Sequence, residues 1–469
     1  MMVGIFSITN SKADIPLGSP IQINAEDWTI QVGNEGAGPV KIIIDPDSND
    51  AIILIKAFVN SNYNWSIMRI SPEGTLVWCT ELGSPHDIAY SGLCLSPDGD
   101  IVYTLTEGMV VGAVSAPEPE IYLASFEADT GIYIDMYALE NLGYELITGT
   151  NPDMLFHPDN PDRLFIHYHS YNQVTLDKKV QVLDFDLVGK GPKWITTFIM
   201  NGRSPKAGGM YYSNQYLYCI TNYETPDNGH KRAYIWKVDS GGTELPIAEQ
   251  ISIGSDVDYY VTGFSGYGSQ IVAVIRSNEV NVSVSTYVQF FDDDLTIDYQ
   301  YMLALNNIYN VYVIDAYLWD SGLKLSILGY VKYSNILPEE NSNEEQGSLA
   351  FIANYKVDHV NGYLKIINVH YHGITQFYER LEDSAFLQGF GYYLTGFTEF
   401  LTDPAIIGNN GFLAKYPMLA TITPIEPLGS IILEDIGQYI TKNWISLSAG
   451  GGVGILVGGL VIGLVRRKK

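Results

Sequence analysis

Cysteine is scarce in this 469-residue chain, which contains only Cys79, Cys94 and Cys219. Three thiols cannot build a disulfide framework and allow one bridge at most. Cys94 and Cys219 lie inside apolar runs, where free thiols are usually buried. The sequence therefore excludes a disulfide-stabilised scaffold.

Basic residues are also few, with 26 Lys and Arg against 53 Asp and Glu, which gives a formal net charge of −27. Such a surface repels the phosphate backbone of nucleic acid and the headgroups of an anionic membrane leaflet. Nucleic acid is excluded as a partner, and the acidity is interpreted as a solubilising surface.

Motifs for catalysis are missing. The chain has no G-x-S-x-G elbow, no phosphate-binding glycine loop and no H-E-x-x-H pair. Ala128-Asp129-Thr130-Gly131 resembles one repeat of pyrroloquinoline-quinone dehydrogenase propellers, but Tyr133 lies near the place of their terminal tryptophan. We therefore assign no catalytic residue and no cofactor.

Metal-binding patterns are incomplete. His167-Tyr168-His169 and His370-Tyr371-His372 put alternate histidines on one face of a strand but lack a third ligand at a characteristic spacing, so we interpret them as strand surface. Asp45–Asp50 begins like a calcium loop, but it lacks the glycine and has Lys56 at the twelfth position. It is predicted to be a turn, and Asp292–Asp294 a hairpin tip. No metal site is assigned.

The N-terminus lacks a complete export signal. Met1–Phe6 is apolar but too short for a signal-peptide core, and no basic residue precedes it. Ser11-Lys12-Ala13 has the small-x-small form of a cleavage site. Residues 1–13 are interpreted as a truncated signal segment. The alternative is a C-terminal tail anchor that leaves the domain in the cytoplasm.

The C-terminus carries one long apolar run. Ile445–Val465 has 21 residues without a charge, enough at ~1.5 Å per residue to cross a bilayer core of ~30 Å. Residues 466–469 are all basic, so the positive-inside bias places them in the cytoplasm. The prediction is a single-pass cell-membrane protein with a transmembrane helix at 445–465, a stalk at 417–443 and the bulk of the chain outside the cell.

Glycines recur every fourth residue within this span. Gly450, Gly454 and Gly458 form a ladder that allows two helices to approach closely. The spacing predicts a dimer through the membrane helix. Glycine is also simply common in membrane helices, which is the other interpretation.

What is abundant is tyrosine, glycine and proline, at 34, 45 and 21 residues. Aromatic and β-branched residues favour strands, and glycine and proline favour turns. A strand ending in a large apolar residue before a polar turn occurs seven times, every 53 to 64 residues. These strands are Trp65–Ile70, Tyr122–Phe126, Val180–Phe185, Tyr234–Val238, Tyr287–Phe291, Phe351–Tyr355 and Phe412–Tyr416.

Each unit has a second strand upstream, often after a turn such as Ser96-Pro97-Asp98-Gly99. Seven units of this form predict an all-β, seven-bladed β-propeller of four-stranded blades over residues 21–416. The strand-like segment Ile21–Gly33 precedes the first full unit. It is predicted to complete the last blade and so to cover two sheet edges.

The last unit carries a family resemblance. Gly391–Thr398 followed by Gly411–Tyr416 resembles the short repeat of seven-bladed surface propellers of bacteria and archaea (SBBP-like repeats). Gly329-Tyr330 with Ala350–Tyr355 matches more loosely. This family is defined by its architecture, so the resemblance implies display and binding and brings no active site.

The connections from second to third strand are the long ones, which indicates binding on that face or neutral variation in surface loops. We predict a protein or glycan ligand there, and a recognition or adhesion function. The candidate ligand-binding residues are His169, Tyr171, Tyr223, Asp227 and His230. Asn64 and Asn281 begin glycosylation triplets. The alternative function is a glycosidase- or lactonase-type hydrolase whose acidic residues come from several blades.

Overall fold

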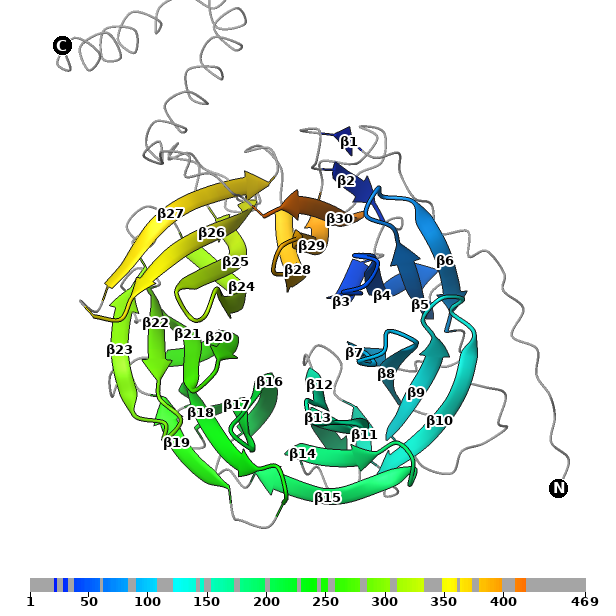
Figure 1. Ribbon diagram of the computed structural model, residues 1–469, viewed down its shortest axis with the longest axis horizontal. Helices are drawn as coiled ribbons and strands as arrows, with labels where there is room; N and C mark the ends of the chain where they lie inside the picture. The colour runs from blue at the N-terminus through cyan, green and yellow to red at the C-terminus, as the bar shows by residue number, and fades with distance from the viewer. Residues whose placement is uncertain are drawn as a thin grey trace, which may run out of the picture. The chain divides into compact units, whose positions relative to one another are not determined.

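The computed structural model describes residues 21–418 except for the gaps 23–27, 33–37, 60–61, 83–89, 108–120, 141–143, 147–152, 173–177, 199–202, 226–228, 243–245, 252–257, 279–284, 304–309, 333–347, 361–362, 373–378 and 399–409. The regular structure of the described residues is β-strand throughout, in seven sheets. Figure 1 shows the sheets as blades around a central axis. The predicted all-β, seven-bladed propeller of four-stranded blades is confirmed.

The first three blades follow one another along the chain. Blade 1 contains β3 (Gly38–Ile44), β4 (Ala51–Val59), β5 (Asn62–Ile70) and β6 (Leu76–Glu81). Blade 2 contains β7 (Tyr90–Leu95), β8 (Ile101–Glu107), β9 (Ile121–Glu127) and β10 (Tyr133–Glu140). In blade 3, β11 (Tyr144–Leu146) and β12 (Asp153–His157) both pair with β13 (Asn160–Asn172), which is followed by β14 (Lys178–Asp186) and β15 (Gly191–Phe198).

Blades 4 to 6 repeat the same antiparallel order. Blade 4 contains β16 (Arg203–Ser213), β17 (Tyr216–Glu224), β18 (Lys231–Asp239) and β19 (Ile247–Ile251). Blade 5 contains β20 (Asp258–Tyr267), β21 (Gln270–Asn278), β22 (Ser285–Phe291) and β23 (Ile297–Met302). Blade 6 contains β24 (Asn310–Trp319), β25 (Lys324–Lys332), β26 (Ser348–Asp358) and β27 (Tyr363–His372).

Blade 7 joins the two ends of the propeller. It contains β28 (Glu379–Leu387), β29 (Gly391–Thr398) and β30 (Asn410–Pro417), and its fourth strand is β2 (Trp28–Gln31), with β1 (Ile21–Gln22) beyond it. Ile30 lies opposite Leu413 in the antiparallel register. Ile30 and Val32 are fully buried, in a cluster that includes Ile42 of blade 1. The segment predicted to complete the last blade thus supplies its outer strands.

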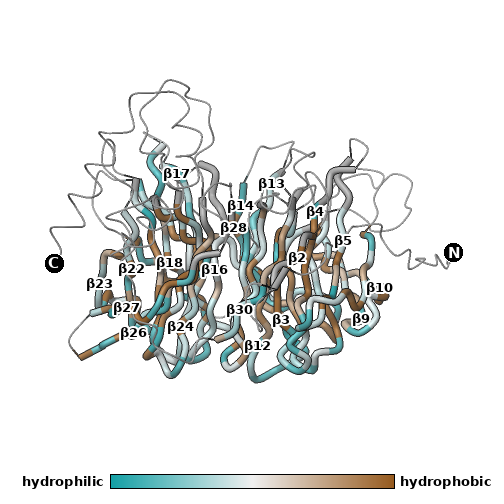
Figure 2. Tube along the Cα trace, turned by 90° about the horizontal axis from the view of Figure 1, so that it is seen from above, coloured by the Kyte–Doolittle hydropathy of each residue, from teal (hydrophilic) through white to brown (hydrophobic). Residues whose placement is uncertain are grey.

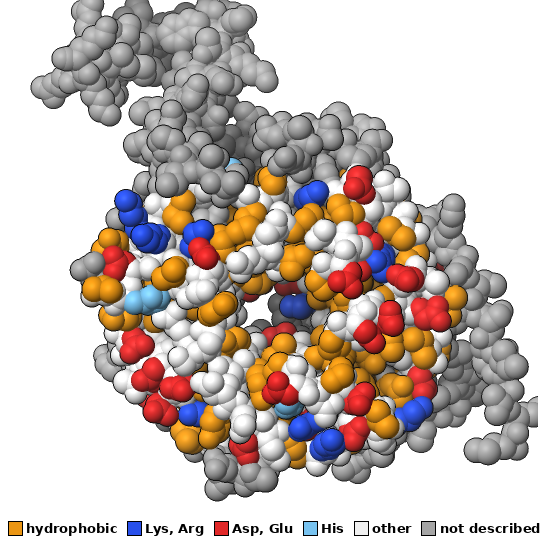
Figure 3. Space-filling model, viewed as in Figure 1, with side chains coloured by type: hydrophobic (Ala, Val, Ile, Leu, Met, Phe, Trp, Pro, Cys, Tyr) orange, Lys and Arg blue, Asp and Glu red, His pale blue; other side chains and the backbone are white. Residues whose placement is uncertain are grey.

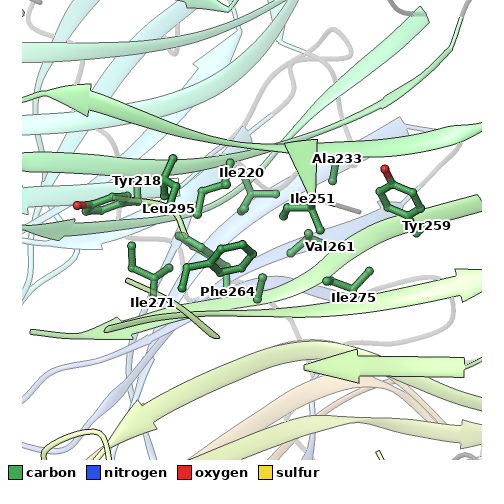
Figure 4. Close-up of a cluster of buried hydrophobic side chains, with 13 residues drawn as sticks. Tyr218, Ile220, Ala233, Ile251, Tyr259, Val261, Phe264, Ile271, Ile275 and Leu295 are labelled. Carbon is green, nitrogen blue, oxygen red and sulfur yellow. The ribbon is translucent and has the colours of Figure 1, made fainter. Parts of the chain in front are cut away.

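The hydrophobic core lies in the seams between neighbouring blades. Buried clusters fill the seams 1–2, 2–3, 3–4, 4–5, 6–7 and 7–1. Figure 4 shows the cluster between blades 4 and 5, with Ile220 and Val261 in its middle and Tyr218 and Tyr259 at opposite ends. Full burial of one such side chain contributes about 1.5–3 kcal/mol, so the seams carry most of the stabilisation.

Blade position explains the sequence pattern. Second and third strands are covered on both faces, so Ala51–Ile55 of β4 is an unbroken apolar run with no exposed surface. The outer strand β15 is largely exposed and polar instead. In Figure 2 the hydrophobic colour lies along the body of the strands, and the hydrophilic colour gathers at the described turns along one edge.

The innermost strands share a bulge. The register between first and second strand shifts in blades 1, 2, 4, 5, 6 and 7, for example between Val313 and Asp315 and between Leu381 and Asp383. A bulge bends the strand and turns a side chain to a new direction. These repeated bulges help to determine which side chains face the central axis.

The described residues contain no helix long and apolar enough to cross a membrane. The predicted membrane helix at 445–465, its Gly450, Gly454 and Gly458, the basic tail at 466–469 and the signal segment at 1–13 lie outside the described residues, as does nearly all of the predicted stalk at 417–443. No described residue tests these predictions.

Candidate functional site

The predicted ligand-binding residues belong to two neighbouring blades. His169 and Tyr171 lie near the end of β13 in blade 3, and Tyr223 lies near the end of β17 in blade 4. His230 comes just before β18, where its carbonyl accepts a hydrogen bond of 2.8 Å from the Thr225 N–H. All four lie at the ends of strands that lead into or out of the predicted long loops, and we call this end of the propeller the long-loop rim.

Their exposure differs. His169 and Tyr223 are buried, at 2% and 8% exposure, and Tyr223 stacks on Tyr234 with ring centroids 5.3 Å apart. Tyr171 is half-buried, with the Lys178 ammonium 5.8 Å from its ring. His230 is half-buried, and its Nδ1 lies 2.6 Å from an Asp258 carboxylate oxygen. His169 and Tyr223 therefore offer a ligand little surface.

Of three further predicted positions, the structure describes one. Asp227 and Asn281 lie outside the described residues. Asn64 lies in β5, opposite Ala57.

The histidine pair in blade 3 is not strand surface as predicted. His167 is fully buried and packs edge-on against Phe198, 5.7 Å away. Burial lowers the pKa of His167 to about 3, so the ring is neutral. The described residues contain no group of three or more histidine, cysteine or acidic side chains placed to hold a metal.

The opposite end of the propeller, which we call the short-turn rim, joins blades through paired charges. Asp45 and Asp50 form the predicted turn of blade 1, and both accept hydrogen bonds from Arg69, of 2.6 and 2.5 Å. Arg69 is 6% exposed, and it also donates to the Ala128 carbonyl of blade 2 and to Asp129. A buried cation is thus matched by carboxylates on the same rim.

Aromatic side chains reinforce the same rim. The Trp78 indole N–H of blade 1 donates to the Ala128 carbonyl of blade 2 over 2.8 Å. Gly131 lies against the Trp78 ring with a φ of +68°, so a Cβ at this position would lie 2.5 Å from the ring. Trp194 of blade 3 meets Gly242 of blade 4 in the same way. These contacts join neighbouring blades at the short-turn rim.

The central channel is lined by four charged residues from four blades. We call Lys41, Asp153, Asp315 and Asp383, from blades 1, 3, 6 and 7, the channel layer. The Lys41 ammonium lies 3.5 Å from Asp383. Figure 3 shows the hollow at the centre of the ring, with basic and acidic side chains on its wall. No motif in the sequence indicates this group.

Their pKa values are strongly perturbed. Burial, followed by the Asp383 carboxylate, raises the pKa of Asp315 to about 7. Burial also raises the pKa values of Asp153 and Asp383, although Lys41 opposes it. Burial disfavours the charge of Lys41, but the three carboxylates outweigh it and raise the pKa of Lys41. A carboxyl that titrates near neutrality is one mark of a catalytic site.

Every carboxylate oxygen in the channel layer already has a hydrogen-bond donor. Asp383 accepts from the Ile42 N–H of blade 1 over 2.7 Å, and Asp153 accepts from the Met210 N–H of blade 4 over 2.8 Å. Their other oxygens accept from Lys41 and from the Met154 N–H.

Asp315 is held in the same way. Its Oδ1 accepts from the Ala316 N–H over 2.8 Å, and its Oδ2 accepts from the Tyr317 hydroxyl and from Ser384 of blade 7, over 2.5 and 3.2 Å. The acids therefore bind neighbouring inner strands together.

The long-loop rim carries a row of basic and aromatic side chains across blades 4, 5 and 6. Arg276 lies 3.6 Å from the Tyr312 ring centroid and 5.8 Å from that of Tyr260. Tyr260 also has the exposed Lys231 5.4 Å from its ring, and Tyr312 stacks on Tyr330 at 4.7 Å and 5°. We call these five residues the rim row. Each lies within three residues of the long-loop end of its strand.

Comparison with known proteins gives nothing narrower than the fold described above. No protein-family model matches the chain, and no similar curated protein is found. Among solved structures, the chain is similar to an oligogalacturonate lyase in complex with manganese, with 11% identity, 86% of this chain and 97% of that chain covered, and a TM-score of 0.46.

Two further structures are similar to the same extent. The β-propeller domain of the Trilobed protease from Pyrococcus furiosus matches with 12% identity over 81% of this chain and 95% of that chain, at a TM-score of 0.45. Extracellular domains 1–2 of Drosophila Semaphorin 1a match with 8% identity over 82% and 86%, at 0.47. The three differ in what their names describe, and at this similarity none of them bears on the function of this chain.

Proposed function

We propose that the protein is a recognition propeller that binds a protein or glycan ligand at the long-loop rim. Held in the cell membrane by residues 445–465, it displays the propeller outside the cell. The observation that carries the binding function is the rim row, where Tyr260, Arg276 and Tyr312 meet across two blades. Lys231 is exposed and Tyr260 and Tyr312 are half-buried, so these three offer the surface of the rim row, whereas Arg276 and Tyr330 are only 9% and 8% exposed. Tyrosine and arginine dominate binding surfaces because they offer large, rigid contact area with polar ends.

A hydrolase is the second candidate, and the channel layer favours it. Asp315 titrates at a pKa of about 7, and Asp383 and Asp153 come from other blades. General acid–base catalysis uses a carboxyl of this kind. It ranks second because the carboxylate oxygens of these three residues are engaged by neighbouring strands, as described above, so their hydrogen bonds already serve to hold the ring.

A binding screen with the full chain in detergent tests the recognition function. We expect ligands from glycan and peptide arrays to bind the wild type and to lose about tenfold or more in affinity with Tyr312→Ala, a hot-spot effect of ~1.4 kcal/mol. Asp315→Asn in the channel is the matched control and should leave this affinity unchanged. Unchanged circular dichroism spectra and a single cooperative unfolding transition of each free variant show that the fold is intact.

Assays of turnover with chromogenic glycosides and lactones test the hydrolase alternative. Turnover that disappears with Asp315→Asn and survives Tyr312→Ala replaces the recognition function with the hydrolase. The display of the propeller is tested separately, since protease added to intact cells should release a fragment of nearly full length. Complete protection of the chain instead supports the cytoplasmic tail anchor.

A further inference from the structure

Arg276 is a buried cation without a counter-charge among the described residues. It is 9% exposed and lies in β21, the second strand of blade 5. Among the described residues, its side chain makes one hydrogen bond, to Tyr260, and lies over the rings of Tyr260 and Tyr312. No described carboxylate forms an ion pair with it. Asp258, on the neighbouring strand β20, is engaged by His230 and by the Lys231 N–H. This chain has 53 acidic residues, yet none of the described ones pairs with this arginine.

One edge of the guanidinium has no hydrogen-bond partner among the described residues. Nη1 donates to the Tyr260 hydroxyl over 2.8 Å, whereas Nε is buried and has no hydrogen-bond partner among the described residues. Nη2 makes no hydrogen bond with them either. The guanidinium carbon Cζ lies 3.6 Å from the Tyr312 ring centroid, which restricts the movement of the group. The Nε–Nη2 edge is therefore held in place by the protein, and its donors have no partner among the described residues.

Such an arrangement is costly without an anion. Removing a charged group from water requires a partner charge and hydrogen bonds, and a buried donor left unpaired costs about 1–3 kcal/mol. The tyrosine rings attract the cation but do not neutralise it. On the short-turn rim, the buried Arg69 and the half-buried Arg163 both have carboxylate partners. The site at Arg276 has the same cation, and an anion from outside would complete it.

We propose that Arg276, flanked by Tyr260 and Tyr312, is the subsite that binds a carboxylate group of the ligand. The Nε–Nη2 edge of arginine is a fork that matches the two oxygens of a carboxylate, and such bidentate pairs are among the strongest hydrogen-bonded contacts in proteins. This inference rests on the proposed recognition function and deepens it, because it specifies an acidic ligand.

Binding of small carboxylates to the full chain in detergent tests the subsite by calorimetry. Glucuronate and a tripeptide with a free C-terminus are the two carboxylate probes, and glucose and the amidated tripeptide are their uncharged counterparts. We expect one carboxylate probe to bind, and its uncharged counterpart to bind at least about tenfold more weakly. Whichever probe binds identifies the source as a sugar acid or a peptide.

Variants connect the binding to the fork. Arg276→Gln should weaken it by about tenfold or more, and Arg276→Lys should weaken it similarly, because an ammonium cannot form two parallel hydrogen bonds. The control is Lys190→Gln, which removes an equal charge from an exposed lysine on the short-turn rim and should have no effect.

Three results overturn the inference. One is the absence of binding by both carboxylate probes up to about 10 mM. Another is phosphate binding as tightly as either carboxylate. The third is retention of full affinity in Arg276→Gln. If array ligands bind and lose affinity with Tyr312→Ala but not with Arg276→Gln, the recognition function is supported and the carboxylate subsite is contradicted. If the small carboxylates bind but no array ligand does, only the carboxylate subsite is supported.

Discussion

The two rims of the propeller treat buried arginine differently. On the short-turn rim, Arg69 is enclosed by Asp45 and Asp50 and reaches the neighbouring blade. On the long-loop rim, Arg276 is enclosed by Tyr260 and Tyr312, with no described carboxylate paired to it. Both side chains are more than nine-tenths buried. The difference lies in whether a described residue supplies the anion.

This contrast separates two uses of one residue type. A buried cation matched within the chain holds the fold together, since removing either partner leaves an uncompensated charge. A buried cation that contacts only aromatic rings is stabilised by them but keeps its net charge. That charge can attract an anionic ligand. We therefore assign the short-turn rim to stability and propose the long-loop rim for recognition.

The largest expected effect comes from breaking the charge cluster of the short-turn rim. Arg69→Met leaves Asp45 and Asp50 buried without their cation. We expect a loss of about 3–5 kcal/mol in the free energy of unfolding, because breaking a buried ion pair strands the remaining charge. The melting temperature should fall by roughly 4–6 °C, measured by circular dichroism. An unchanged melting temperature contradicts the structural assignment of this rim.

An intermediate effect is expected from the channel layer between the rims, through pH. The pKa of Asp315 in the folded protein is about 7 against 3.8 in the unfolded chain, so the folded state holds a proton that the unfolded state releases. Its contribution is fully present below about pH 4 and is lost as pH rises toward 7. Three pKa units at ~1.4 kcal/mol each set an upper limit of about 4 kcal/mol, and channel water reduces it.

Asp315→Asn removes this titration. We expect the variant to have a flatter dependence of unfolding free energy on pH between 4 and 7 than the wild type, measured by urea denaturation at several pH values. Asp153 and Asp383 have raised pKa values of the same sign, so part of the slope should persist. A slope identical to that of the wild type would falsify the protonated state of Asp315.

The smallest effect is expected at Arg276 in the protein without ligand. Arg276→Gln removes a buried charge that has no described counter-ion, so the melting temperature should stay within about 2 °C of the wild type or rise slightly. Differential scanning calorimetry of Arg276→Gln and Arg69→Met side by side gives the comparison directly. A fall in Arg276→Gln as large as in Arg69→Met means that a carboxylate of the chain itself pairs with Arg276, and the two rims are then equivalent.

The blades follow from the sequence pattern alone. Runs such as Ala51–Ile55 and Ile271–Ile275 are apolar because second strands are covered on both faces, and such strands repeat at the spacing expected of a blade array. The segment containing Ile30 and Val32 was identified as the missing fourth strand because an array that closes must cover its last edge. Local pattern and chain order are sufficient for such statements.

Which polar residues meet depends on the folded arrangement of the blades. Lys41 and Asp383 are 342 positions apart in the chain and lie 3.5 Å apart because the ring closes and bulges turn both side chains toward the axis. Arg276 and Tyr312 belong to different blades and meet only in the seam. A polar residue in a strand has the same local pattern whether it faces solvent, a channel or a partner charge. Its role is fixed by residues distant in sequence, which no local pattern contains.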